Sequence, residues 1–225
     1  MNYKSIAIDG PAGAGKSTLA RRLAEKLGFL YVDTGAIYRT VALAVLRAGI
    51  DPADAARVVP LLGGLDIRMS YGGDGVQRMY LAGEDVSEAI REHRVSSAAS
   101  KASALPEVRA FLLDFQRRQA QEHDVVMDGR DIGTVVLPDA DVKIFLTAAP
   151  ETRAERRLLE LEQRGQAADF NTVLRDIRER DHQDETRPVA PLKRAEDAAL
   201  LDTTRLNLEQ SLEGLLSLVK EKIAL

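Results

Sequence analysis

The sequence predicts an α/β fold in which helices flank a parallel sheet. Short apolar runs alternate along the chain with longer stretches whose apolar residues recur at helical spacing. Strands that are separated by helices form βαβ units, which place the strands in parallel. A Gly-rich loop also joins the first apolar run to the first helical stretch, as expected where a strand runs into a helix.

The expected elements follow one another in this alternation. A helix is predicted over residues 16–27, because Leu19, Leu23 and Leu27 form one apolar stripe. The next helix is predicted over 36–48, with Gly49 as its stop signal. The other predictions are helices at 151–164, 170–186 and 206–223, and strands at 5–8, 29–32, 124–127, 142–146 and about 200–201.

Residues 65–81 break the alternation and predict a β-hairpin on the turn Gly72-Gly73-Asp74-Gly75. Asp85 and Glu88 resemble a capping box, before helical residues that run to about 104 and a helix from about 106. We therefore expect an inserted domain, residues 35–121, within a core formed by residues 1–34 and 122–225. A lid is expected at about 153–170.

Composition argues against several kinds of site. The 225 residues carry a net charge of −4 and contain no cysteine, which excludes disulfides and thiolate metal sites. No apolar run approaches the roughly 20 residues of a membrane span, and no signal-peptide core precedes the first strand. We expect a monomer in the cytoplasm that binds neither nucleic acid nor a membrane.

The strongest motif fits the pattern G-x-x-x-x-G-K-[ST] and lies between a predicted strand and a predicted helix. In that context backbone N–H groups wrap phosphate oxygens, and the helix N-terminus adds positive potential. Lys16 would reach the β- and γ-phosphates of ATP, and Ser17 would bind Mg²⁺ through its hydroxyl. The alternative is a plain Gly-rich turn. The expected ATP-binding residues are Gly10, Pro11, Ala12, Gly13, Ala14, Gly15, Lys16, Ser17 and Thr18.

A phosphate loop leaves three classes open: a GTPase switch, an ATPase motor or sensor, and a small-molecule kinase. A GTPase would carry N-K-x-D, and none of Asn2, Asn171 and Asn207 begins that pattern. A motor usually has a longer chain. A kinase needs a second pocket for its acceptor and a cover that excludes water.

Two clusters follow predicted strands, where an acceptor pocket is expected in such a sheet. After the second strand, Thr34 also fits a helix N-cap, and Arg39 lies early in a helix, where the dipole disfavours a cation unless an anion is bound. After the third strand, Asp128 suits hydrated Mg²⁺, with Arg130 and Asp131 beside it. The alternative for this second cluster is a tight turn with a local ion pair.

Two further clusters lie on predicted helices. Arg153, Arg156 and Arg157 share one helix face and suit either a lid that closes on the phosphoryl group or a solvated face. Farther along the chain, Arg180, Asp184 and Arg187 form one stripe. That stripe offers two guanidinium forks and an acceptor to a nucleotide, or else a row of surface ion pairs.

Together these segments resemble the bacterial cytidylate kinases. The sequences GPAGAGKST, DTGAIYR, DGRDIGT and RERDHQDETRPVAPL match that family in order and spacing, over essentially the whole chain. The resemblance implies a P-loop kinase fold with a five-stranded parallel sheet, a nucleoside-monophosphate-binding insertion with the hairpin, and a helical lid. It also implies phosphorylation of CMP and dCMP by ATP with Mg²⁺. Another acceptor (UMP, dTMP or shikimate), or a non-catalytic ATP-binding module, stays open.

The resemblance also implies residue roles. Arg39, Arg130 and Arg187 would hold the acceptor phosphate, with Thr34 nearby where some members have Ser. Asp184 and Arg180 would hold the ribose. Ser100, Arg109 and Asp131 would read cytosine, since Asp accepts from the exocyclic amine and Arg donates to N3 and O2. The residues expected in catalysis are Lys16, Arg39, Arg130 and Arg157.

Overall fold

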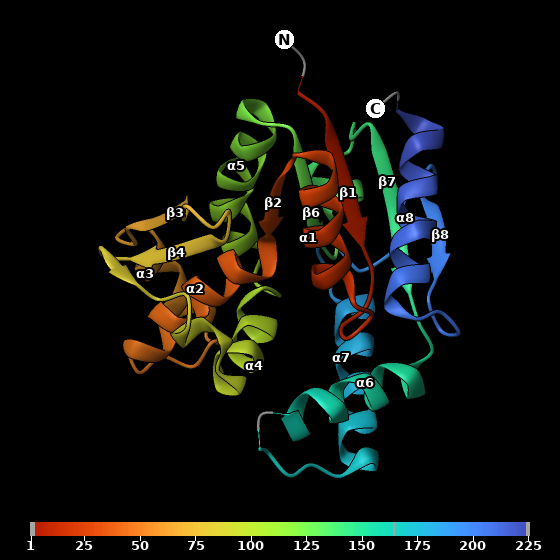
Figure 1. The fold of residues 1–225 in the computed structure, drawn as a ribbon. Coiled ribbons are helices and arrows are strands. Elements are labelled where there is room, and N and C mark those ends of the chain that lie inside the picture. Colours follow the sequence, from red (N-terminus) through yellow and green to blue (C-terminus); the bar gives the residue numbers. More distant parts are fainter. Residues whose placement is uncertain (1–2, 164, 224–225) are drawn as a thin grey trace.

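A five-stranded parallel sheet lies at the centre of the molecule (Figure 1). The computed structural model describes residues 3–163 and 165–223. Every neighbouring pair of strands in this sheet is parallel, which confirms the predicted fold class. In sheet order the strands are β2 (Leu30–Asp33), β6 (Val125–Gly129), β1 (Ser5–Asp9), β7 (Val142–Thr147) and β8 (Ala199–Asp202).

The sheet has a hydrophobic layer on each face. On one face α1 (Lys16–Leu27) and α8 (Leu208–Lys222) cover Ile6 and Ile8 of β1. On the other, α2 (Thr34–Arg47) and α5 (Pro106–Glu122) belong to the layer that contains Ala7. Alternate residues of β1 thus face opposite layers, as strand geometry requires. Because both faces are covered, the central strands consist of continuous apolar runs.

The hairpin prediction is confirmed, and a third short strand extends it. In chain order the segment contains α3 (Ala55–Leu62), β3 (Ile67–Tyr71), β4 (Gln77–Leu81), β5 (Glu84–Asp85), the 3₁₀ turn η1 (Ala89–Arg91) and α4 (His93–Ala102). Its apolar side chains share one hydrophobic layer with those of the central sheet. That residues 35–121 form a domain of their own therefore stays a prediction.

The hairpin is also tied to the sheet by hydrogen bonds. The Gln77 amide accepts from the Asp33 N–H at 2.8 Å and donates to the Asp33 carbonyl at 3.2 Å. The Tyr71 hydroxyl donates to the Tyr31 carbonyl at 2.9 Å. Because both contacts lie on β2, the insertion braces the strand that leads into α2.

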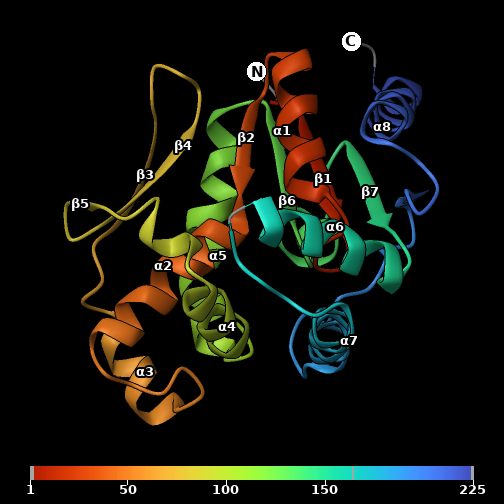
Figure 2. The same ribbon diagram turned by 60° about the horizontal axis from the view of Figure 1, so that its bottom comes forward.

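Helices α6 (Pro150–Gln163) and α7 (Phe170–Thr186) pack against each other through Ala154, Val173 and Ile177. Figure 2 shows this pair on one side of the strand ends and α2 with α4 on the other. The predicted helix 170–186 is confirmed, whereas Arg164, at the end of the predicted helix 151–164, lies outside the described residues. Within residues 3–163 and 165–223, none of the helices has the length and hydropathy that a bilayer crossing needs.

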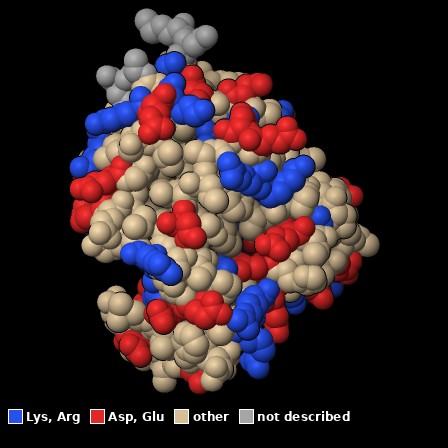
Figure 3. Space-filling view, turned by 90° about the vertical axis from the view of Figure 1, so that its right-hand side faces the viewer, with Lys and Arg blue, Asp and Glu red and all other residues tan. Residues whose placement is uncertain are grey.

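Charged side chains of both signs are mixed on the face formed by α8, β8 and α7 (Figure 3). On this face of the described chain the Lys and Arg side chains form no continuous basic surface. The mixture gives this side no electrostatic preference for a polyanion.

Two cap predictions are wrong. Asp85 lies in β5, and its carboxylate accepts from the Ser87 N–H at 2.9 Å, so the next α-helix begins only at His93. Asp33, and not Thr34, caps α2, because its carboxylate accepts from the Ala36 N–H at 2.9 Å. The Thr34 hydroxyl instead donates to the Asp128 carbonyl at 2.7 Å, which ties the two loops together.

We predict that Gly10 tolerates no side chain. Its φ of 151° is rare for residues with a Cβ, and a Cβ would lie 1.9 Å from the Leu146 carbonyl oxygen. Gly28 is a matched control, because its φ of 69° is also positive while nothing lies within 4 Å of a Cβ there. Gly28→Ala should cost about 1–2 kcal/mol of unfolding free energy, and Gly10→Ala clearly more. Equal losses in urea unfolding would contradict this.

Candidate active site

The phosphate loop runs from Gly10 to Gly15, between β1 and α1. Gly13 and Gly15 have φ values of 73° and 88°, which favour glycine. Gly15 occupies the N-cap of α1 with no side-chain hydrogen bond, so the first amides of the helix keep their capacity to bind an anion. Lys16 is buried, and its Nζ donates to the Pro11 carbonyl at 2.7 Å. Burial, and then the nearby Arg130, lower the pKa of Lys16.

Asp128 lies directly behind this loop, at the end of β6. One carboxylate oxygen accepts from the Ser17 hydroxyl at 2.9 Å, and the other accepts from the Tyr31 hydroxyl at 2.8 Å. Burial, and then the negative charge of Asp33, raise the pKa of Asp128 to about 6. Within the described chain no group of three or more His, Cys, Asp or Glu side chains is placed to hold a metal. A cation here would therefore need oxygen ligands from a bound phosphate as well.

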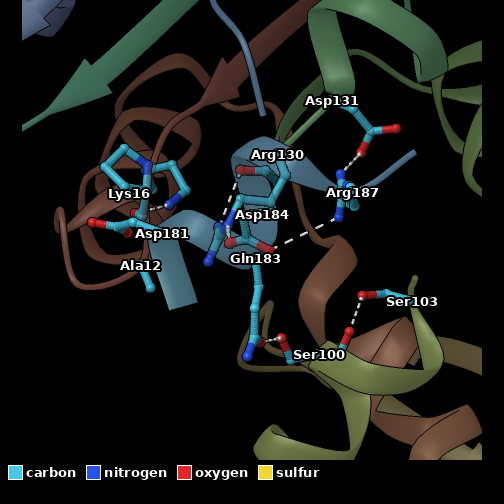
Figure 4. Close-up of polar contacts among 12 residues, drawn as sticks. Ala12, Lys16, Ser100, Ser103, Arg130, Asp131, Asp181, Gln183, Asp184 and Arg187 are labelled. Atoms are coloured by element: carbon cyan, nitrogen blue, oxygen red, sulfur yellow. Dashed lines mark hydrogen bonds and ion pairs between the residues drawn. The ribbon is translucent and has the colours of Figure 1, made fainter. Parts of the chain in front are cut away.

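Arg130 and Asp184 form the centre of the second half of the site (Figure 4). The Arg130 Nε donates to the Asp184 carboxylate at 2.8 Å. The Arg187 guanidinium lies 3.9 Å from the other oxygen of Asp184 and 3.6 Å from Asp131. These residues come from the β6 end and from α7, which are far apart in the sequence.

Arg39 and Arg180 complete this cationic group. Arg39 donates to the Asp33 carboxylate at 2.9 Å, and its Nε has no hydrogen-bond partner among the described residues. Arg180 also has an Nε without a partner there. Burial, and then the charge of Arg130, lower the pKa of Arg180 to about 10. The geometry thus gathers guanidinium groups that are incompletely paired.

Asp131, which Arg187 approaches from one side, is paired with Arg109 on another. This ion pair is buried, and the Arg109 guanidinium carbon lies 5.4 Å from the centre of the Tyr38 ring. Ser100 on α4 donates to the Gln183 side chain at 3.4 Å (Figure 4). The Asp131 carboxylate and the Arg109 guanidinium thus lie together beside an aromatic ring.

The residues that bring these groups together also match a known family. The family model described as cytidylate kinase matches residues 6–221. The chain belongs to the cytidylate kinase family. It is 50% identical over 218 residues to the cytidylate kinase of Caldicellulosiruptor bescii, covering 97% of this chain and 96% of that protein. It is also 50% identical over 218 residues to the cytidylate kinase of Mycobacterium leprae, with 96% of each chain covered.

Similarity to solved structures bears on the fold of this chain and not on its function. An uncharacterized protein from Eubacterium ventriosum matches with a TM-score of 0.53 and 12% identity, over 96% of this chain and 98% of that one. The residues that the resemblance to cytidylate kinases implied are brought to one edge of the sheet. Their individual roles remain predictions.

The three arginines expected in the lid of this family member make different contacts. Arg153 is buried, with a bidentate pair to Asp181 and a 2.9 Å hydrogen bond to the Ala12 carbonyl of the phosphate loop. Arg156 donates to the Thr203 carbonyl at 2.8 Å. Arg157 is paired with Glu160 at 3.0 Å and lowers the pKa of Arg180 through its charge, though burial is the larger cause.

Sequence reasoning assigned no role to several residues that organise the site. The Tyr31 hydroxyl contacts Asp128, and the Asp33 carboxylate contacts Arg39. Of the two, only Asp33 lies within a recognised motif, DTGAIYR. Asp9 accepts from two backbone amides of residues 132 and 133, each at 2.7 Å. In the sequence, the only indication of a role for Asp9 is its position at the end of a strand, directly before the phosphate loop.

The raised pKa of Asp128 leads to a prediction about stability and pH. A carboxyl whose pKa is higher in the folded protein costs stability when ionised, so the penalty is present at pH 7 and diminishes as pH falls through about 6. Asp128→Asn removes the charge, while its amide can still accept from one hydroxyl and donate to the other. The stability of this variant relative to wild type should fall by about 1 kcal/mol from pH 7 to pH 5.

Urea unfolding with EDTA at the two pH values measures this difference. Asp139→Asn, at an exposed aspartate that precedes β7, is the control for loss of one carboxylate. A stability difference for Asp128→Asn that stays constant with pH would contradict the prediction.

Proposed function

We propose that this protein transfers the γ-phosphoryl group of ATP to CMP or dCMP. Membership of the cytidylate kinase family supports the acceptor. The observation that carries the proposal is the buried group of incompletely paired guanidinium groups beside the phosphate loop. Such a group is costly unless an anion binds to it.

The donor side fits a nucleoside triphosphate with Mg²⁺. Lys16 and the uncapped amides of α1 offer positive charge to the β- and γ-phosphates. The Ser17 hydroxyl and the Asp128 carboxylate, 2.9 Å apart, would hold the ion together with phosphate oxygens. When bound, Mg²⁺ neutralises charge on the phosphates.

The acceptor side fits a nucleoside monophosphate. Arg39, Arg130 and Arg187 can hold the phosphate with paired hydrogen bonds, and the charge of a phosphate dianion would offset theirs. Asp184 with Arg180 would hold the ribose. This arrangement would bring the acceptor phosphate toward the phosphate loop, because Arg130 follows directly on β6, next to β1.

Asp131, Arg109 and Ser100 would read the base. Asp131 accepts from the exocyclic amine of cytosine, while Arg109 and Ser100 donate to its ring acceptors. Uracil has a carbonyl in place of that amine, so its oxygen would face the Asp131 carboxylate. A buried mismatch of this kind discriminates strongly because polar groups are left unpaired.

The reaction is an in-line transfer in which positioning and charge neutralisation dominate. A phosphate oxygen of the acceptor is already nucleophilic, so no strong general base is needed. Lys16 and Arg157 would stabilise the transferring group, and Arg39 and Arg130 would orient the acceptor. Closure of α6 and α7 over both nucleotides would exclude water. A cytoplasmic monomer remains our expectation.

We predict ATP-dependent ADP release with CMP and dCMP, and little with UMP, dTMP or shikimate. A coupled ADP assay with this set of acceptors measures the rate for each.

Lys16→Ala should lower turnover by at least about a hundredfold without unfolding the protein, because charge stabilisation at the phosphates is lost. Lys26→Ala, at an exposed lysine on the same helix, is the control. Preferred turnover of another acceptor, or none with any, would refute the proposal.

A further inference from the structure

We propose that Asp9 and Arg117 are positioning residues that fix the segment carrying Arg130 and Asp131 relative to the phosphate loop. The inference rests on the proposed function, because it concerns how the donor and acceptor halves of that site are aligned. Neither residue belongs to the groups assigned above to a substrate. Both contact one short turn, η2 (Ile132–Val136), which begins directly after Asp131.

The η2 turn is a single turn of π-helix. The Val136 N–H donates to the Asp131 carbonyl at 3.1 Å, and the Leu137 N–H donates to the Ile132 carbonyl at 2.7 Å. π-turns are rare and concentrate at functional sites. Such a short turn supplies few hydrogen bonds of its own, so its position depends on contacts from outside.

Asp9 holds the first amides of this turn. Its two carboxylate oxygens accept from the Ile132 N–H and the Gly133 N–H, each at 2.7 Å. The approach is close, since a Cβ on Gly133 would lie 3.4 Å from the nearer Asp9 oxygen and 3.2 Å from Lys143. The side chain of Asp9 is buried at the end of β1, where the next residue is Gly10.

Arg117 holds the opposite end of the turn. From α5, its Nε donates to the Val136 carbonyl and its Nη2 to the Val135 carbonyl, both at 3.0 Å. An anion at the amide end and a cation at the carbonyl end match the dipole of the turn. The two side chains thus clamp η2 from β1 and from α5, and we call them the η2 clamp.

The clamp connects the phosphate loop to Arg130 and Asp131, because each of its contacts lies within a few residues of one of them. Asp9 precedes the phosphate loop by one residue, and the amides it binds follow Asp131 by one and two residues. A shift of η2 would therefore move Asp131 and Arg130 relative to Gly10, which is itself packed against Leu146. Alignment of phosphoryl donor and acceptor is sensitive to displacements of about 1 Å.

The surroundings of Asp9 disfavour the ionised form of its carboxyl group. Burial raises its pKa to about 6, although the two amides act in the opposite direction. Ionised groups that are held at such a cost are concentrated at functional sites. This observation supports a role for Asp9 in alignment, alongside the geometry.

The test compares Asp9→Asn and Arg117→Met with wild type in steady-state kinetics with ATP and either CMP or UMP. Asn keeps one acceptor but turns an amide donor toward a backbone N–H, and Met keeps the stem of Arg117 without its donors. Both variants should lower kcat with CMP, and both should lower the CMP-to-UMP ratio of kcat/KM about tenfold, because Asp131 is displaced. The KM for ATP should change much less.

Three further variants separate alignment from stability. Asp141→Asn removes a carboxylate that accepts from the Ser5 N–H at 2.8 Å, at the opposite end of β1, and should change stability without changing the ratio. Arg117→Lys restores one donor and should recover part of the ratio. Asp131→Asn gives the CMP-to-UMP ratio of kcat/KM that remains when Asp131 no longer distinguishes cytosine from uracil. If Asp9→Asn does not fold, the two Arg117 variants decide.

Unchanged kcat and an unchanged CMP-to-UMP ratio in folded clamp variants, with lower melting temperatures alone, would overturn the inference. An equal change in Asp141→Asn would overturn it as well. Failure of the proposed function gives a different result, because wild type itself would then show no turnover of CMP.

Discussion

The structure depends on a balance of charge at the carboxyl edge of the sheet. Within the described residues, five guanidinium groups gather around three carboxylates in a largely buried region, and Arg39 and Arg180 each keep an Nε without a partner. The guanidinium groups are those of Arg39, Arg109, Arg130, Arg180 and Arg187, and the carboxylates are those of Asp33, Asp131 and Asp184. In the proposed function, the phosphate dianion of the acceptor would compensate this positive charge, which would explain why so many arginines are tolerated here.

The fold brings these groups together because the strands are parallel. The ends of β2 and β6 lie side by side, so Asp33 and Asp128 become neighbours although almost a hundred residues separate them. Helix α7 crosses the same edge and adds Arg180 and Asp184. The hairpin contributes from a distance, since Gln77 fixes the backbone of Asp33, whose carboxylate in turn holds Arg39.

Local patterns in the sequence predicted much of this architecture. Apolar spacing predicted α1 and α7 with the bounds that the structure has, and the Gly-rich turn predicted the hairpin. The position of each motif after a strand predicted that the clusters at 33–39 and 128–131 would meet. Such predictions succeed because they depend on short-range geometry and on the single rule that parallel strands end at one edge.

Contacts between segments that are far apart in the sequence could not be predicted from local patterns. Thr34 and Asp33 are both good caps, and the choice depends on the Asp128 carbonyl, which binds the Thr34 hydroxyl. The spacing of Arg153 and Arg157 predicted a common face, but Arg153 is drawn to Asp181 and the Ala12 carbonyl. Likewise, Asp9 reaches across the sheet to a turn over a hundred residues away.

The most direct test of the charge balance is the affinity for CMP compared with that for cytidine, measured by titration calorimetry. The account predicts that cytidine binds at least about a hundredfold more weakly than CMP, because it leaves the guanidinium groups uncompensated. This difference should shrink in Arg39→Met, which removes a guanidinium assigned to the phosphate, and persist in Arg118→Met, at an exposed arginine on α5. Equal affinity of the wild type for cytidine and CMP would contradict it.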